Sequence, residues 1–254
     1  MGPFAISLII FAGSFGAAII GMILHVKLPD HHLDSDSRDV VKLVMGLIAT
    51  MSALVLSLLI ASANGSYDRQ QNELNALSAN IVLLDRALEF YGPAARAARD
   101  AIRDTVRKTH DRIWSPKGVR PEVLASAETQ NAANADLARL QGLSPKTDAE
   151  RMLLTRALQL ADSISQSRLL MTAQLGSAIA WPFLVVLVFW VCVLFLGFGL
   201  FARSNATVTM ALLVGALSVA GAIFLILELN DPYHGLMRIS DGPLLSAMSQ
   251  ISHQ

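Results

Sequence analysis

The chain has 254 residues, of which 53% are apolar, and it carries 20 acidic and 20 basic side chains. So large an apolar share exceeds what one soluble core of this length normally buries, which excludes an ordinary soluble domain. A net charge of zero gives no basic surface for counterion release, so we expect no nucleic-acid partner. The single cysteine, Cys192, excludes an internal disulfide and a cysteine-based metal cluster.

Four apolar windows reach the length of about 20 residues that a helix needs to cross a hydrocarbon core of ~30 Å. They cover residues 3–26, 40–63, 179–201 and 208–229. The loops inside each pair are short, so each pair is expected to form an antiparallel hairpin. A cleaved signal peptide is the competing interpretation of residues 1–24. It is disfavoured because no Lys or Arg precedes the apolar run, which is also too long for a typical signal.

The windows predict an all-α membrane protein with four transmembrane helices in two hairpins and a helical soluble segment between them. The expected division is a transmembrane hairpin at 1–64, a soluble helical segment at 65–176, a second transmembrane hairpin at 177–229 and a C-terminal tail at 230–254. We therefore expect a multi-pass protein of the cell membrane, with the lipid bilayer as its immediate partner.

The soluble segment is predicted to begin with a helix that continues directly out of the second span. Its apolar residues alternate at spacings of three and four, as one buried helix face requires. These residues are Leu74, Leu77, Ile81, Leu84 and Leu88. Gly92 and Pro93 are expected to end this helix, and Pro93 suits the first turn of the next one.

The second soluble helix is expected to place an apolar face inside and four arginines on its solvated side. The inner residues are Ala98, Ile102, Val106, Thr109 and Ile113, and the arginines are Arg96, Arg99, Arg103 and Arg107. His110 is expected at the surface. Residues 114–121 form a loop, and a third helix follows as far as Leu140. The capping-box spacing of Thr147 and Glu150 starts a fourth helix.

Small or weakly polar residues form a stripe along the second span. At ~100° per residue they fall within an arc of roughly 80°, so they share one helix face. The stripe consists of Gly46, Thr50, Ala53, Ser57, Ala61 and Asn64. It permits close helix packing in lipid, or it lines a wet pathway for ions. These six residues are our candidates for a pore lining.

Similar stripes on the first and fourth spans favour packing as a shared explanation. They consist of Gly13, Ala17 and Gly21, and of Ala211, Gly215, Ser218 and Ala222. Four helices are too few to bury three such stripes against one another, so some should face neighbouring subunits. Leucine at Gly21 or Gly215 is therefore expected to lower the oligomeric state or the yield.

Two polar clusters adjoin the spans. Glu228, Asn230, Asp231 and His234 follow the fourth span and form either a site or an interfacial turn. Asp30, His31, His32, Asp34 and Asp36 lie between the first two spans, and their spacing matches no closed metal site, so a solvated loop is the preferred interpretation. We expect no metal and no cofactor. The sequence contains no catalytic motif, which argues against an enzyme.

Three separated stretches of the chain resemble a bacterial membrane family called bestrophin-like, whose function is unassigned. The stretches are residues 47–56, 77–86 and 224–236, which read LIATMSALVL, LSANIVLLDR and FLILELNDPYHGL. A remoter similarity links the chain to the bestrophins, which are pentameric anion channels. It rests on the arrangement of two membrane hairpins around a helical segment and on residues 232–235. Two features of those channels are missing. No acidic run follows Gly235 to hold calcium, and residues 40–63 contain no aromatic side chain to narrow a pore.

The resemblance implies a homo-oligomer, with five subunits as in the bestrophins, that conducts small ions and prefers anions. The alternative is a non-conducting membrane scaffold or sensor whose soluble helices bind a partner. The resemblance also implies that the soluble helical segment is cytoplasmic. The Lys and Arg residues next to the spans slightly favour the opposite orientation, because Lys27, Arg38, Lys42 and Arg203 outnumber the basic residues on the other side.

Overall fold

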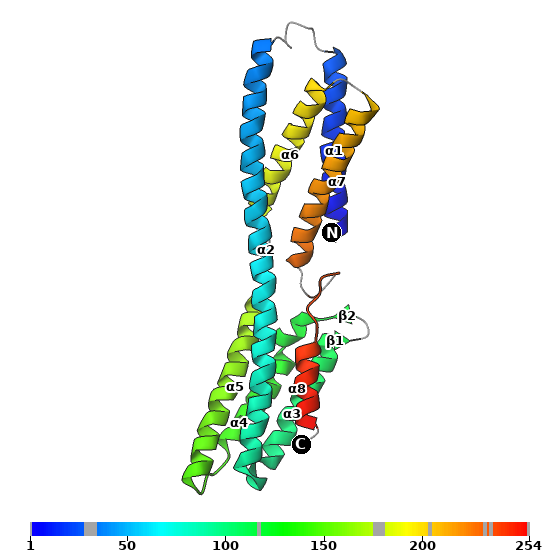
Figure 1. Cartoon of the computed structure of the whole chain (residues 1–254). Coiled ribbons are helices and arrows are strands. Elements are labelled where there is room, and N and C mark those ends of the chain that lie inside the picture. Colours follow the sequence, from blue (N-terminus) through cyan, green and yellow to red (C-terminus); the bar gives the residue numbers. More distant parts are fainter. Residues whose placement is uncertain are drawn as a thin grey trace. The chain divides into compact units, whose positions relative to one another are not determined.

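The computed structural model describes residues 2–27, 35–115, 118–174, 181–202, 205–230, 233 and 236–252. The chain divides into two compact units. The membrane unit comprises Met1–Ser66 and Ala178–Asn230, and the helical unit comprises Tyr67–Ser177 and Asp231–Gln254. Four helices are long and apolar enough to cross a bilayer (Figure 1). The predicted all-α membrane fold with four apolar spans is confirmed.

The membrane unit contains α1 (Pro3–Lys27), the first part of α2 (Ser35–Tyr91), α6 (Trp181–Phe201) and α7 (Ala206–Leu229). Helix α1 packs on both α6 and α7. Its buried residues recur at spacings of three and four, so they form one narrow face. They are Ser7, Ile10, Ser14, Ala18 and Gly21. Most of these side chains are small, which lets the backbones approach closely where apolar burial gives little driving force.

Helices α1 and α6 cross at a pair of glycines. A Cβ atom on Gly21 would overlap the carbonyl oxygen of Leu196, and one on Gly199 would overlap that of Ala18. A Cβ atom on Gly215 of α7 would lie 3.4 Å from the Phe195 ring on α6. Gly21 and Gly215 therefore face α6 of their own chain, so leucine at either position would act first on packing within the chain, and its effect on the oligomeric state stays a prediction.

Replacement of Gly21 by alanine should destabilise the membrane unit. The added Cβ meets rigid backbone, so the two helices must separate, and overpacking of this kind typically costs about 1–3 kcal/mol. The matched control is Gly16→Ala on the same helix, because no atom lies within 4 Å of a Cβ there. We expect a lower melting temperature and yield in detergent for Gly21→Ala, and no loss for Gly16→Ala. Equal melting temperatures for the two variants would contradict the tight crossing.

The helical unit begins with the second part of α2, which runs unbroken from the membrane span to Tyr91, as predicted. Gly92 has a φ of 101°, a conformation that favours glycine, and the next segment starts at Pro93. The other elements are η2 (Pro93–Ala95), α3 (Arg96–Ile113), β1 (Trp114–Ser115), β2 (Gly118–Val119), η3 (Pro121–Ala125), α4 (Ala127–Gln141), α5 (Asp148–Gln174) and α8 (Gly242–Ser252).

The predicted capping box starts α5. The backbone N–H of Glu150 donates to the Thr147 hydroxyl at 3.1 Å, and the N–H of Thr147 donates to the Glu150 carboxylate at 3.2 Å. Reciprocal bonds of this kind satisfy two N–H groups that the first helical turn leaves without partners. The apolar inner face of α3 is also as predicted, with Ala98, Ile102 and Ile113 buried.

Three features of the helical unit differ from the sequence analysis. The expected loop at 114–121 contains a short antiparallel ladder in which Trp114 pairs with Val119. The segment treated as a C-terminal tail forms α8, whose buried residues Leu244 and Ile251 belong to the core of this unit. His110 is 8% exposed rather than superficial. Its Nε2 atom lies 3.2 Å from the Asp241 carboxylate, just before α8.

Two of the arginines predicted on the solvated side of α3 instead bind a buried carboxylate of α2. Arg99 and Arg103 each donate two hydrogen bonds to Asp85, at 2.7–2.9 Å. The Asp85 side chain is only 4% exposed. Burial raises the pKa of this carboxyl, but the hydrogen bonds and charges of the two guanidinium groups outweigh burial, so the pKa lies below its ordinary value. The cluster joins α2 to α3.

Removal of the Asp85 charge should strongly destabilise the helical unit. Asp85→Asn leaves two arginines beside a neutral amide, and breaking such a buried pair costs roughly 3–5 kcal/mol. In the wild type, this contribution is complete above the unfolded pKa of about 4 and is lost as pH falls through the lower folded value. The melting temperature of the wild type should therefore fall as the pH is lowered through this range. The melting temperature of Asp85→Asn should lack this fall.

The control for this change is Asp104→Asn, at an exposed carboxylate that pairs with Arg107 and Lys108 on α3. Exposed pairs contribute little to stability, so this variant should melt close to the wild type. A comparable loss of stability in both variants would show that Asp85 does not have the structural role assigned to it.

Candidate functional site: the faces of α2 in the membrane unit

The part of α2 in the membrane unit buries one face against its own chain. We call this the own-chain face, and its buried residues are Met45, Ser52, Leu59 and Ala63. Leu59 and Ala63 belong to a core cluster with Leu187 and Phe195 of α6. Met45 lies so close to Gly197 of α6 that a Cβ atom there would be 2.6 Å from its Sδ atom. This face holds α2 against the other spans.

A second face of α2 exposes large aliphatic side chains. We call it the aliphatic face, and it consists of Leu43, Leu47, Met51, Leu54 and Leu58, which are 48–76% exposed. A surface of this composition suits contact with lipid acyl chains, because it offers no polar group that lipid would leave without a hydrogen-bond partner. The aliphatic face therefore needs neither water nor a packed helix beside it.

The third face is the stripe of small residues identified from the sequence, which we call the small face. All six of its residues, Gly46, Thr50, Ala53, Ser57, Ala61 and Asn64, are exposed in the structure. At ~100° per residue its centre lies roughly 140° from the own-chain face and roughly 80° from the aliphatic face. Packing inside the chain therefore does not account for the small face.

The hydroxyl groups of the small face are bonded within α2. The Thr50 hydroxyl donates to the carbonyl of Leu47 at 2.8 Å, and the Ser57 hydroxyl donates to that of Ala53 at 2.8 Å. Each hydroxyl proton therefore has a partner even if no water is near, while the oxygen lone pairs remain available on the exposed surface. This arrangement is compatible with lipid, with a neighbouring subunit and with water.

A groove separates α2 from α6 beside the first residue of the small face. It has a volume of about 400 Å³ and is lined by Lys42, Met45, Gly46, Ala49, Gly197, Phe198, Phe201 and Ala202. Lys42 is exposed and pairs with Asp39 at 3.2 Å. Sequence analysis did not find this groove, because it depends on the separation of two helices that are distant in the chain. The groove places one cation next to Gly46.

The polar cluster after the fourth span is only partly described. Glu228 is buried, at 5% exposure, rather than reaching freely into water. Asn230 ends α7, and its backbone N–H donates to the carbonyl of Ile226 at 3.2 Å. Asp231 and His234 lie outside the described residues, so the arrangement of the four-residue cluster stays a prediction.

The acidic and histidine residues between the first two spans lie mostly outside the described part of the chain. This applies to Asp30, His31, His32 and Asp34, and Asp36 is described only as part of the α2 backbone. Elsewhere, in the part that the structure describes, no group of three or more His, Cys, Asp or Glu residues is placed to hold a metal ion.

Comparison with known proteins identifies a family and a fold. A family model, the bestrophin-like domain, matches residues 12–244. No curated protein matches the chain. A crystal structure of a membrane protein superimposes on this structure with a TM-score of 0.68, covering 97% of each chain at 12% sequence identity. At that identity the similarity concerns the fold alone.

Cysteine labelling should distinguish the three faces of α2. In a Cys192→Ser background, cysteines at Thr50 and Ser57 should react with small water-soluble thiol reagents if water reaches the small face. A cysteine at Leu54 on the aliphatic face should be protected by lipid, and one at Leu59 by its own chain. The readout is the labelled fraction in intact membranes. Failure of both small-face cysteines to react would exclude a wet small face.

Proposed function

The chain belongs to the bestrophin-like family, and on this premise we propose that it is a homo-oligomeric channel that conducts small ions and prefers anions. The pathway runs along the small faces of several copies of α2. The protein resides in the cell membrane with its helical unit in the cytoplasm. The observation that carries the proposal is the exposure of all six small-face residues on a helix whose own-chain face is buried against the other spans.

The three faces of α2 suit a ring of subunits. The small face and the aliphatic face each lie roughly 140° from the own-chain face, so both are on the side of α2 away from its own chain. If the own-chain core is on the outside of a ring, the small face is the one assigned to the axis, because it carries hydroxyl and amide groups and the aliphatic face carries none. The aliphatic face then lies to one side, where a neighbouring subunit or lipid covers it. A ring of five copies is the arrangement that the remoter similarity to bestrophins implies.

The chemistry of the small face allows ions to pass without a strong binding site. Gly46, Ala53 and Ala61 leave space beside the backbone, and the stripe holds no charged side chain that would trap an ion of opposite sign. An anion requires the hydroxyl protons of Thr50 and Ser57 to rotate away from the backbone carbonyls. Lys42, one turn before Gly46, places an ammonium group at that end of the span, where it pairs with Asp39.

Ion flux through purified protein in liposomes tests the proposal. Chloride efflux should exceed that of empty liposomes, and Ser57→Trp should reduce it at least tenfold, because an indole ring occludes a narrow lumen. Leu54→Trp is the matched control on the aliphatic face and should leave the flux unchanged. Both variants should keep the oligomeric state that the wild type shows in detergent.

Absence of flux from the wild type would favour the alternative, a non-conducting scaffold or sensor. Loss of assembly in Ser57→Trp, together with unlabelled cysteines on the small face, would assign that face to contacts between subunits. Reversal potentials in a salt gradient separate anion from cation conduction, and a cation preference would contradict the anion part of the proposal.

A further inference from the structure

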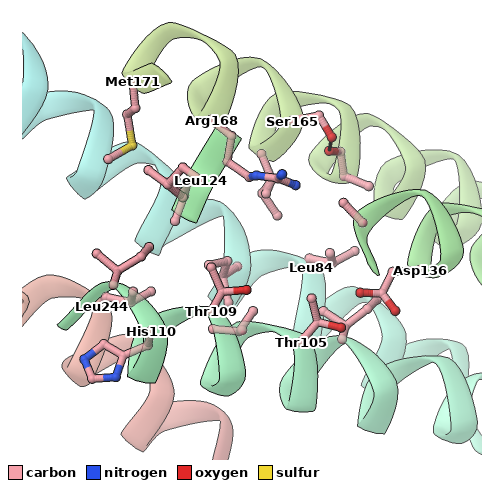
Figure 2. Close-up of a pocket in the computed structure, with 18 of the residues that line it drawn as sticks. Leu84, Thr105, Thr109, His110, Leu124, Asp136, Ser165, Arg168, Met171 and Leu244 are labelled. Atoms are coloured by element: carbon pink, nitrogen blue, oxygen red, sulfur yellow. Dashed lines mark hydrogen bonds between the residues drawn. The ribbon is translucent and has the colours of Figure 1, made fainter. Parts of the chain in front are cut away.

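A cavity of about 110 Å³ lies inside the helical unit, among α2, α3, α4 and α5 (Figure 2). Its lining is mainly apolar and includes Leu74, Leu77, Ile102, Leu140 and Ile164. All of its lining residues belong to the helical unit, so the cavity does not depend on the ion pathway proposed above. Spaces between the helices of a bundle are common sites for small ligands.

Arg168 of α5 lines this cavity and has no ionic partner among the residues that the structure describes. Figure 2 shows its side chain directed from α5 into the space between the helices. Its Nε atom is buried and makes no hydrogen bond. Among the described residues no carboxylate lies within 4.0 Å of the guanidinium, whereas Arg99 and Arg103 share Asp85. Burial lowers the pKa of Arg168 from its ordinary value, and no neighbouring charge opposes that effect.

The other polar groups of the cavity do not neutralise Arg168. Asp136 of α4 also lines the cavity, but its carboxylate accepts a hydrogen bond from Arg139 at 2.8 Å. The Ser165 hydroxyl donates to the carbonyl of Ala161 at 3.0 Å. His110 is held between Asp111 and Asp241. The cavity thus combines apolar walls with one cation that has no counterion.

Arg168 is partly buried, so its charge has lost part of its hydration without gaining an ionic partner among the described residues, and this is unfavourable. A carboxylate suits the guanidinium, since both are planar and can form two parallel hydrogen bonds. A dianion such as phosphate would retain a buried charge that one arginine cannot neutralise. Chloride would pair with Arg168 but would leave the apolar part of the cavity empty.

We propose that this cavity binds a small monocarboxylate with an apolar body, whose carboxylate pairs with Arg168 while the apolar body contacts the leucine and isoleucine side chains. The cavity volume is somewhat below the ~150 Å³ of an engineered apolar cavity that holds benzene. The apolar body is therefore no larger than a benzene ring, the lining side chains adjust to admit it, and the carboxylate lies beside Arg168 at the edge of the apolar space. Aromatic and short-chain carboxylates are the corresponding classes.

Benzoate is the probe for this site, because it has the required charge and size and does not partition strongly into detergent. Purified full-length protein is titrated with benzoate by calorimetry and melted in its presence. Saturable binding and a rise in melting temperature are expected. Benzyl alcohol, which has a similar shape but no charge, should bind at least tenfold more weakly, and sodium chloride at equal ionic strength should give no comparable shift.

Arg168→Met tests the role of the guanidinium, since it removes the charge but keeps an unbranched apolar stem. Benzoate affinity should fall at least tenfold, while the ligand-free variant should melt no lower than the wild type. A purely structural arginine would instead give a less stable variant that still responds to benzoate. Arg156→Met, at an exposed position of the same helix, is the matched control and should bind benzoate normally.

A second variant, Ala161→Leu, fills part of the cavity without changing any charge, and it should also weaken benzoate binding. If Arg168→Met does not yield folded protein, the benzoate affinity of Ala161→Leu tests the proposal. Absence of a benzoate effect on the wild type, or equal benzoate binding by the wild type and the folded variants, would overturn the proposal and leave a cavity filled by water. Chloride binding without benzoate binding would overturn it as well.

Discussion

Helix α2 has two different surroundings along one unbroken run of residues, lipid beside its first part and water beside its second. In hydrocarbon no water is available for backbone groups, so a spanning segment has to bond every N–H and C=O within itself, and a helix does this. In water, the same helix is stabilised by burying an apolar face. Residues up to Ser66 follow the first requirement and residues from Tyr67 follow the second. The side chains of α2 therefore change along the helix, from mainly apolar residues in the membrane unit to a single apolar face in the helical unit.

The difference between lipid and water also explains how the helices pack in the two units. In the membrane unit apolar burial gives little driving force, so α1 and α6 associate through a close approach of backbones at Gly21 and Gly199. In the helical unit the leucine stripe of α2 forms the core with α3, α5 and α8. Small residues therefore set the closest backbone approach in the membrane unit, while large apolar residues contribute to the cores of both units.

The buried Asp85 and the partly buried Arg168 show how pairing changes the role of a charge in the helical unit. Asp85 receives four hydrogen bonds from two arginines, so its charge is stabilised where it stands and joins two helices. Arg168 has no such partner among the described residues, and it adjoins an apolar cavity. A charge that is paired as Asp85 is stabilises the contact between two helices. A charge without a counterion, as in Arg168, is available to bind an anion.

Much of the fold follows from the sequence, because hydrophobic length and periodicity are local properties of a chain. The four spans, the continuation of α2 through Leu74 and Leu88 and the capping box at Thr147 all depend on residues within a few helical turns of one another. The shared face of Gly46, Thr50 and Ser57 has the same origin, since helical geometry alone places them together. Its exposure could not be predicted, because that depends on which side of α2 meets α6.

Tertiary structure decided which polar residues are buried and what they contact. Arg99 and Arg103 have the helical spacing of a solvated face, and only the position of α2 brings Asp85 between them. Arg168 follows Ala161 and Ile164 at positions of the apolar face of α5, a spacing that indicates a buried charge, but the lack of a counterion is visible only when α3 and α4 are in place. Sequence determines which face of a helix a residue occupies, whereas the neighbouring helices determine whether that face meets lipid, water or a partner.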